Sequence, residues 1–97
     1  ALYGMNDVLI KIEEMAKSLK NLCSYIDVRN DENGPFIFAF GHQDTHSLQL
    51  RKIEEQFVLE LWHGKNSEEE VLTSEPSYPS AEAALEKAKE WLGRDAI

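Results

Sequence analysis

The sequence has few of the features that define several large protein classes. Cys23 is its one cysteine, which excludes an internal disulfide framework and is typical of a reducing compartment. Its longest unbroken apolar run, residues 36–40, is far shorter than the roughly 20 residues that a membrane-spanning helix needs. The five glycines are scattered, so they form no glycine-rich phosphate-binding loop. These absences predict a cytoplasmic protein that does not act at a membrane.

Basic residues are also scarce. Ten Lys and Arg stand against 18 Asp and Glu, which gives a net charge of −8 and an isoelectric point near 4.8. Residues 24–75 hold 11 acidic and four basic side chains, so they carry nearly all of this surplus. Binding to a phosphate backbone requires a basic surface, so we expect no nucleic-acid partner. An acidic surface instead favours a basic protein as partner.

Two segments have the periodicity of amphipathic helices. Apolar side chains recur every three or four positions over residues 8–22, and Asn6 is the expected N-cap. A second stripe over residues 81–92 follows Ser80, which is also a good N-cap, and ends at Gly93. The four residues before Met5 are interpreted as a cloning remnant, and residues 1–97 as one domain.

Between these helices the apolar period is two, which predicts strands. The expected strands cover residues 25–29, 36–40, 48–51 and 57–62, with a short acidic edge strand at 70–73. Residues 30–34 are expected to form a five-residue hairpin loop, and residues 74–80 a surface linker. Because every connection between strands is short, the sheet should be an antiparallel meander. The predicted fold class is therefore α+β: a four- to five-stranded antiparallel meander with the N-terminal and C-terminal helices packed on one face.

The pattern of alternation then assigns residues to the two faces of the sheet. The face under the helices is predicted to carry Ile26, Val28, Phe36, Phe38, Phe40, Leu48, Leu50, Phe57, Leu59 and Leu61. The uncovered face is predicted to carry Tyr25, Asp27, Arg29, Ile37, Ala39, Gln49, Arg51, Val58, Glu60, Trp62 and Leu72. On this assignment the three phenylalanines are core residues, although their ladder also resembles the base-stacking surface of some nucleic-acid-binding sheets.

The uncovered face supplies the candidate binding residues. Large aromatic side chains on an otherwise polar sheet face are enriched at protein interfaces, and Tyr25 and Trp62 fit that description. Charged side chains would surround them. The predicted partner-binding residues are Tyr25, Asp27, Arg51, Glu60, Trp62 and Glu70.

Other polar groups predict no catalytic or metal site. His42, Asp44 and His46 would share one side of an extended segment, but a fourth zinc ligand is missing nearby, so we predict no metal and no cofactor. Cys23 ends the apolar stripe of the first helix, where a buried, unreactive thiol is expected. His63 lies in a turn without a recognisable nucleophile, so we predict that the protein is not an enzyme.

One part of the chain resembles known families. The strand at residues 56–62, the proline-containing loop and the helix segments 80–85 and 90–92 together resemble small acidic bacterial immunity proteins of contact-dependent or polymorphic toxin systems. That resemblance implies an inhibitor that occludes a basic toxin or enzyme. The small acidic α/β plan is also similar to secretion chaperones, which would imply a homodimer, although such chaperones are longer and have more helix after the sheet.

Overall fold

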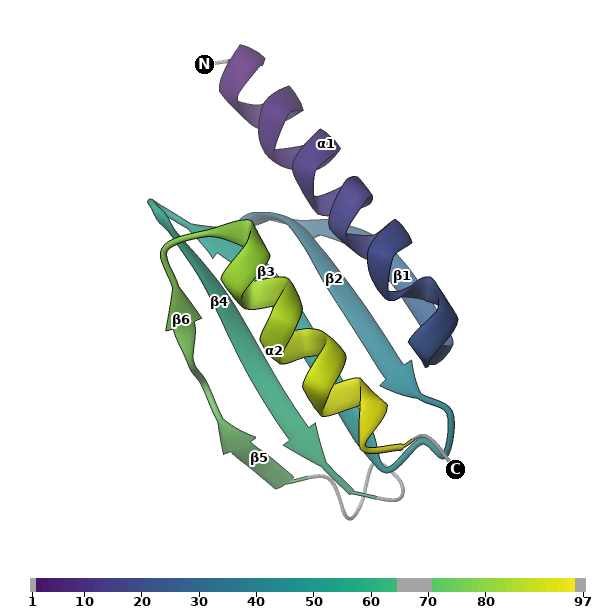
Figure 1. The fold of residues 1–97 in the computed structure, drawn as a ribbon. Helices are drawn as coiled ribbons and strands as arrows, with labels where there is room; N and C mark the ends of the chain where they lie inside the picture. Colours follow the sequence, from purple (N-terminus) through teal and green to yellow (C-terminus); the bar gives the residue numbers. More distant parts are fainter. Residues whose placement is uncertain (1, 65–70, 96–97) are drawn as a thin grey trace.

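Within residues 2–64 and 71–95, which the computed structural model describes (side chains from residue 7 on), two helices cover one face of a six-stranded antiparallel sheet (Figure 1). The strands follow the order β1-β2-β3-β4-β5, and β6 also pairs with β4. The elements are α1 (Leu2–Leu19), a 3₁₀ turn (Lys20–Leu22), β1 (Cys23–Asp31), β2 (Gly34–Gly41), β3 (His46–Ile53), β4 (Gln56–His63), β5 (Val71–Ser74), β6 (Ser77–Tyr78) and α2 (Ala81–Gly93). The predicted α+β meander is confirmed.

The first helix begins earlier than expected. The predicted N-cap at Asn6 is wrong, because α1 is helical from Leu2 and therefore includes residues that precede Met5. A single glycine costs a helix only about 1 kcal/mol, and this segment has no proline to stop it. The second helix begins as predicted: the Ser80 hydroxyl accepts a hydrogen bond from the Ala83 N–H at 3.2 Å.

The orientation predicted for β2 is wrong. Ile37 and Ala39 are fully buried beneath the helices, whereas the side chains of Phe36, Phe38 and Phe40 are half-buried on the opposite face. The cause is the length of the hairpin loop. The loop contains two residues rather than five, and Asp31 pairs directly with Gly34.

A loop of two residues instead of five changes which residues share a face, because side chains alternate along a strand. With the two-residue turn, Val28 pairs with Ile37, and the row continues to Leu50 and Leu59. The short turn is stabilised by Gly34, whose φ of +102° suits glycine, and by an Asn33 N–H that donates to the Asp31 carboxylate at 2.9 Å.

The sheet edge beyond β4 is longer than predicted. β5 confirms the expected edge strand, but part of the expected linker also pairs with β4. Tyr78 of β6 lies opposite Phe57, and the Leu59 N–H donates to the Pro76 carbonyl at 2.9 Å between the two short strands. β5 and β6 therefore act as one interrupted edge strand.

The core lies between the sheet and the helices, with α1 over β1 and β2 and α2 over β3 and β4. Its buried apolar residues are Ile12, Met15, Leu19, Ile37, Ala39, Leu48, Leu50, Phe57, Leu59, Leu61, Ala81, Ala84, Ala88, Trp91 and Leu92. None of the helices in the described ranges is long and apolar enough to cross a membrane.

A buried carboxylate fastens the segment after α2 to the turn between β2 and β3. The Asp95 side chain accepts hydrogen bonds from the N–H groups of Thr45 and His46 at 3.0 and 3.2 Å, from the Thr45 hydroxyl, and from His46 Nδ1 at 2.5 Å. We call this arrangement the Asp95 clamp. Burial alone would raise the pKa of Asp95, but the hydrogen bonds from Thr45 and His46 outweigh it and lower the pKa below its usual value.

Candidate protein interface

The sheet face opposite the helices carries three rows of side chains that cross the strands. We call it the open face. Its rows follow from the pairing register: Tyr25, Phe40, Ser47, Trp62 and Leu72 in the first; Asp27, Phe38, Gln49 and Glu60 in the second; Arg29, Phe36, Arg51 and Val58 in the third. Within the described ranges, both helices pack on the other face, so no described element covers these rows.

An aromatic cluster forms one half of the open face. The rings of Phe38 and Phe40 meet edge to face with centroids 5.0 Å apart, and Tyr25 lies 6.4 Å from both. Tyr25 is 45% exposed, and the two phenylalanines are half-buried. Aromatic pairs with this geometry fix one another's orientation, so the cluster presents a preformed apolar surface.

Two arginines stack on this aromatic surface. The guanidinium of Arg29 lies 4.7 Å from the centroid of Phe38, and that of Arg51 lies 4.5 Å from the centroid of Phe36. Such cation–π contacts hold the flat guanidinium groups against the rings. The arginines therefore extend the contact surface and restrict the motion of the rings beneath them.

The charges on the open face are largely paired within the chain. Arg29 Nε donates to Asp27 at 3.2 Å, and the two terminal nitrogens of Arg51 donate to the two Asp31 oxygens at 2.8 and 2.9 Å. The hydrogen bonds that Arg51 donates lower the pKa of Asp31 to about 2, and the hydrogen bonds that Arg29 donates to Tyr25 and Asp27 raise the pKa of Arg29. Both carboxylates are exposed enough that these pairs contribute little to stability.

A shallow hollow lies beside the aromatic cluster. It measures about 60 Å³ and is lined by Gln49, Arg51, Ile53, Val58 and Glu60. Gln49 pairs with Phe38 on one side and with Glu60 on the other, so the hollow lies over β3 and β4, next to the projecting rings of β2. The open face therefore has a small depression beside its aromatic cluster.

The structure brings together five of the six residues predicted from sequence. Tyr25, Asp27, Arg51, Glu60 and Trp62 lie on the open face; Trp62 is half-buried between Ser47 and Leu72, not under a helix. The sixth, Glu70, lies outside the described residues.

Sequence reasoning missed the three phenylalanines as surface residues, and it therefore missed how apolar the open face is. The signal that could have placed them was the hairpin loop. Any two-residue turn within residues 30–34 puts Val28 and Ile37 on one face, and hence Phe36, Phe38 and Phe40 on the other.

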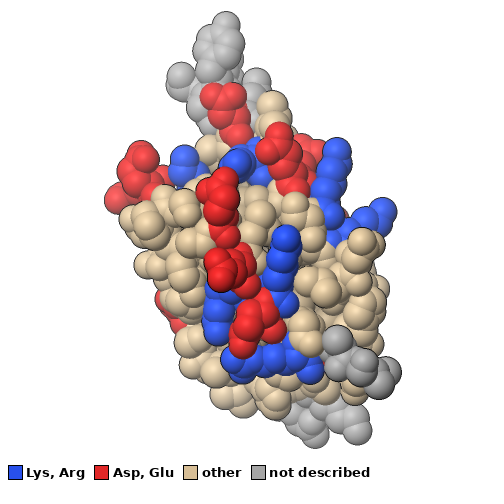
Figure 2. Space-filling view, in the orientation of Figure 1, with Lys and Arg blue, Asp and Glu red and all other residues tan. Residues whose placement is uncertain are grey.

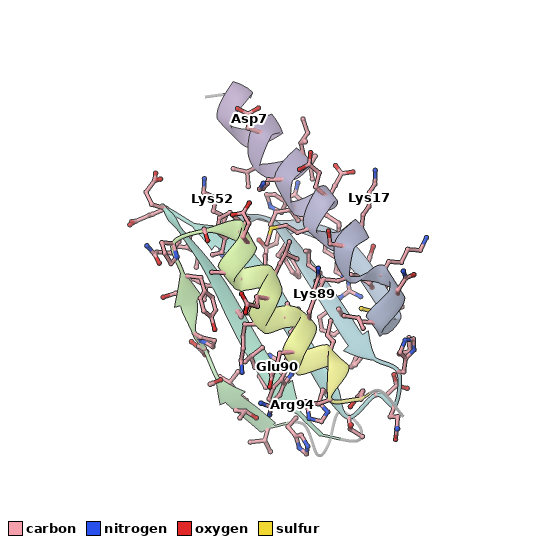
Figure 3. The ribbon with its side chains drawn as sticks, viewed as in Figure 1. Asp7, Lys17, Lys52, Lys89, Glu90 and Arg94 are labelled. Carbon is pink, nitrogen blue, oxygen red and sulfur yellow. The ribbon has the colours of Figure 1, made fainter. Side chains whose placement is uncertain are left out.

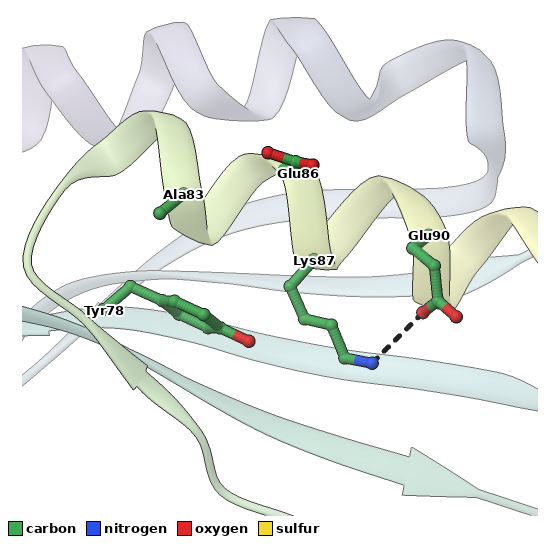
Figure 4. Close-up of a pocket in the computed structure, with 5 residues that line it drawn as sticks. All are labelled: Tyr78, Ala83, Glu86, Lys87 and Glu90. Atoms are coloured by element: carbon green, nitrogen blue, oxygen red, sulfur yellow. Dashed lines mark hydrogen bonds and ion pairs between the residues drawn. The ribbon is translucent and has the colours of Figure 1, made fainter.

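The helix side of the molecule has a different character. Figure 2 shows acidic and basic side chains interspersed along α2, and Figure 3 shows Glu90 and Arg94 together near its end. Glu90 accepts from Lys87 at 3.2 Å and from Arg94 at 2.5 Å. A groove of about 330 Å³ runs between Tyr78 and α2, with the Lys87–Glu90 pair at one side (Figure 4). This groove is flanked by exposed, mutually paired charges and lacks an aromatic cluster comparable to that of the open face.

The three candidate metal ligands point to different partners. His42 Nε2 lies 2.9 Å from the Asn21 carbonyl, Asp44 accepts from the Ser24 hydroxyl at 2.6 Å, and His46 contacts Asp95. His46 also packs between the rings of Trp91 and His63, with centroids 4.8 and 4.7 Å away. Each side chain therefore has a structural role in holding the β2–β3 turn.

Cys23 is the first residue of β1, directly after the 3₁₀ turn, so the prediction that it ends the first helix is wrong. It is half-buried against the core, and its thiol donates to the Leu19 carbonyl at 3.1 Å. Burial raises the pKa of this thiol to about 11, which disfavours the reactive thiolate.

Comparison of the chain with protein-family models, curated protein sequences and solved structures finds no match. The evidence on function therefore comes from the open face itself.

Proposed function

We propose that this chain is a non-enzymatic protein-binding domain whose open face docks on another protein. One observation carries the proposal: a preformed aromatic cluster lies on a sheet face that no described element covers. Exposed aromatic and arginine side chains are the residues that most often dominate binding energy in protein interfaces. A contiguous apolar surface of this kind on a small domain indicates an interaction site.

The acidic balance of the chain favours a basic partner. Glu32 in the β1–β2 turn and Glu54 and Glu55 in the β3–β4 turn lie at the same end of the meander, beside the open face. Negative charge at the rim of an interface speeds association with a basic partner and makes it sensitive to salt. We therefore propose an inhibitor that occludes a basic toxin or enzyme in the cytoplasm, as the resemblance to immunity proteins implies.

A protein partner is favoured over a single-stranded nucleic acid. Bases stack on aromatic rings whose flat faces are accessible, but here guanidinium groups already lie over Phe36 and Phe38. Both arginines are also paired with aspartates, and the chain carries a net charge of −8. A phosphate backbone would therefore meet little free positive charge on this face.

The proposal is tested by comparing variants as baits in a lysate of the source organism. Trp62→Ala removes an aromatic anchor that is not part of the helix-covered core. We expect the wild-type chain to capture a basic protein and Trp62→Ala to bind it about 2 kcal/mol more weakly, about thirtyfold in Kd, with an unchanged circular dichroism spectrum. Glu60→Lys should lower chiefly the association rate.

The matched control is Lys89→Ala, which alters an exposed side chain of α2 on the opposite side of the molecule. It should capture the partner as the wild type does. A partner bound equally by Trp62→Ala, or lost equally with Lys89→Ala, would contradict the proposal. If nuclease treatment released all captured material, the open face would be a nucleic-acid site instead.

A homodimeric chaperone or adaptor is the second candidate. It is favoured by a different property of the open face. In the Arg29–Asp27 pair and in the Arg51–Asp31 pair the two opposite charges neutralise each other within the chain, so a second copy need not supply partners for them.

A further inference from the structure

The two edges of the sheet differ in how well they are protected from a further strand. On one side, β5 and β6 form an interrupted edge of four and two residues, with Pro76 between them. Proline has no N–H to donate, so this edge offers an added strand a broken row of partners. On the other side, β1 is nine residues long and, among the described elements, pairs with β2 alone. The edge of β1 is therefore the continuous one.

The backbone groups on the free edge of β1 follow from its pairing with β2. A two-residue turn closes on a hydrogen-bonded pair, here Asp31 and Gly34, and such pairs alternate with non-hydrogen-bonded pairs along antiparallel strands. The residues that direct their N–H and C=O groups away from β2 are therefore Ile26, Val28 and Asn30. The pairing of Asn30 with Pro35 agrees with this, because proline cannot donate to β1. An added strand would meet three donors and three acceptors.

The edge of β1 lacks the usual protection of an edge strand. Natural edges are blocked by lysine, proline, a bulge or a charge that points inward. The one irregularity in the pairing of β1 lies at its start, between Cys23 and Tyr25. The segment from Tyr25 to Asp31 has neither lysine nor proline, and its charged side chains lie on the open face. This segment can therefore accept a strand along its whole length.

Two rows of the core end at this edge in half-buried apolar side chains. Ile26 lies beside Ala39 and Val28 beside Ile37, in rows that continue to β4 beneath the helices. Ala39 and Ile37 are fully buried, whereas Ile26 and Val28 pack against the core but keep part of their surface exposed. α1 runs along this side of the sheet (Figure 1). Apolar side chains on an added strand would continue both rows and bury more of Ile26 and Val28.

The other side of an added strand would adjoin the open face, next to Tyr25, Asp27 and Asp31. Residues 24–32 carry three acidic side chains and one basic one, Arg29, which Asp27 already holds. The carboxylates of Asp27 and Asp31 remain exposed, so both can accept further hydrogen bonds from lysine or arginine. The edge therefore fits a segment whose side chains alternate between apolar and basic.

We infer that the partner adds an extended segment to the free edge of β1, with apolar side chains beside Ile26 and Val28 and basic side chains beside Asp27 and Asp31. In this mode of binding, main-chain hydrogen bonds provide affinity and alternate side chains provide specificity. The inference rests on the proposed function, because it states how the partner at the open face is held at the adjoining edge. The added strand would lie next to Tyr25, so the rest of the partner reaches the aromatic cluster directly.

The direct test is amide hydrogen exchange of the full chain, followed residue by residue by NMR. In the free chain the outward N–H groups of Ile26, Val28 and Asn30 should be less protected than those of Asp27 and Arg29, which face β2. The probe is a capped seven-residue peptide that alternates lysine and valine, added up to about 5 mM. It should raise the protection of the three outward amides by about tenfold or more and leave Asp27 and Arg29 nearly unchanged.

Two control peptides separate strand addition from other contacts. A peptide of the same composition with its valines in one block lacks the alternation, and it should protect none of the three outward amides. A peptide with glutamate in place of lysine keeps the alternation but brings like charge to Asp27 and Asp31. It should bind about tenfold more weakly than the lysine–valine peptide.

Variants of the edge test the same hydrogen bonds. Val28→Pro removes the central outward N–H without removing a hydrogen bond to β2, and it should weaken peptide binding by about tenfold or more. Val28→Thr is the matched control, because it keeps the N–H and a branched side chain, and its affinity should stay within about threefold of the wild type. Asn30→Pro makes the same change at an exposed position, and it replaces Val28→Pro if circular dichroism shows that variant to be unfolded.

Unchanged protection of Ile26, Val28 and Asn30 at the highest peptide concentration would overturn the inference. Protection that rises with the concentration of the chain alone would also overturn it, because a second copy would then occupy the edge. In the lysate experiment, capture that is weakened by Trp62→Ala but not by a folded Val28→Pro or Asn30→Pro would remove the added strand and leave the proposed function intact. Failure of the proposed function is seen separately, as undiminished capture by Trp62→Ala.

Discussion

The two faces of β2 are both apolar, yet they do different things. Ile37 and Ala39 face inward, are fully buried and leave room for the helices above them. The larger rings of Phe36, Phe38 and Phe40 face outward and contact one another or arginine side chains. The difference shows that the larger apolar side chains of a strand need not mark its core face. On this strand the inner side chains fit a confined space, and the outer ones form an accessible surface.

The sharpest test of this comparison is a pair of truncations. Leu59→Ala, in the inward row with Ile37, should lower the free energy of unfolding by about 2–5 kcal/mol, because it leaves a cavity. Phe38→Ala removes more atoms but from a half-buried site, and it should cost only about 1 kcal/mol. Denaturant unfolding of both variants measures the difference. Equal losses would show that the outward rings belong to the core after all.

The next test concerns Gly41, the last residue of β2, which is buried. A Cβ at this position would lie 2.5 Å from Asp95 Oδ2 and 2.7 Å from Asp95 Cβ. Gly41→Ala should therefore displace the Asp95 clamp and cost about 1–3 kcal/mol of stability.

Gly93→Ala is the matched control for this substitution, because nothing lies within 4 Å of its added Cβ. In the last turn of α2 it should be neutral or stabilise by up to about 1 kcal/mol. If thermal unfolding showed Gly41→Ala to be equally harmless, the packing of Asp95 against Gly41 would be less tight than the structure indicates.

A smaller effect is expected from acid. The folded pKa of Asp95 is lowered, so its hydrogen bonds contribute stability above the unfolded pKa of about 3.9 and lose it as the pH falls through the folded value. Asp95→Asn should be less stable than the wild type at pH 7, and the gap should narrow below about pH 4. Urea midpoints measured across this range give the comparison.

Asp31→Asn is the control for the acid experiment. The pKa of Asp31 is also low, but its carboxylate is exposed, so the wild-type advantage at pH 7 should be much smaller. A constant gap between Asp95→Asn and the wild type at all pH values would contradict the role given to the Asp95 carboxylate.

The smallest effect is chemical. With a pKa of about 11, the Cys23 thiol is about one part in a thousand thiolate at pH 8. Alkylation by iodoacetamide should therefore be roughly a hundredfold slower in the folded chain than in urea. Rapid labelling without urea would mean that α1 does not cover the start of β1.

The sequence allowed most of the architecture to be predicted, because periods of 3.6 and two residues distinguish the helices from the strands. It also placed Tyr25, Asp27, Arg51, Glu60 and Trp62 on one face, since each of their strands alternates between polar and apolar residues. β2 has no such alternation. Its orientation depends on the loop length, and apolar patterning contains no information about that length.

The position of Asp95 was also beyond sequence reasoning. Its partners, Thr45 and His46, are 50 and 49 residues earlier in the chain, and a lone aspartate after a helix has no local pattern that marks it as buried. Only the path of α2 across β3 and β4 brings it to the β2–β3 turn.

The separation between Asp95 and its turn has a consequence for synthesis of the chain. On the ribosome, α1 is made first and can cover β1 and β2 as soon as they pair, whereas β3 and β4 must wait for α2. Until residues 81–95 emerge, the nascent sheet exposes Leu48, Leu50 and Leu61 on one side and the aromatic cluster on the other. During that interval the nascent chain is most prone to aggregate with other chains.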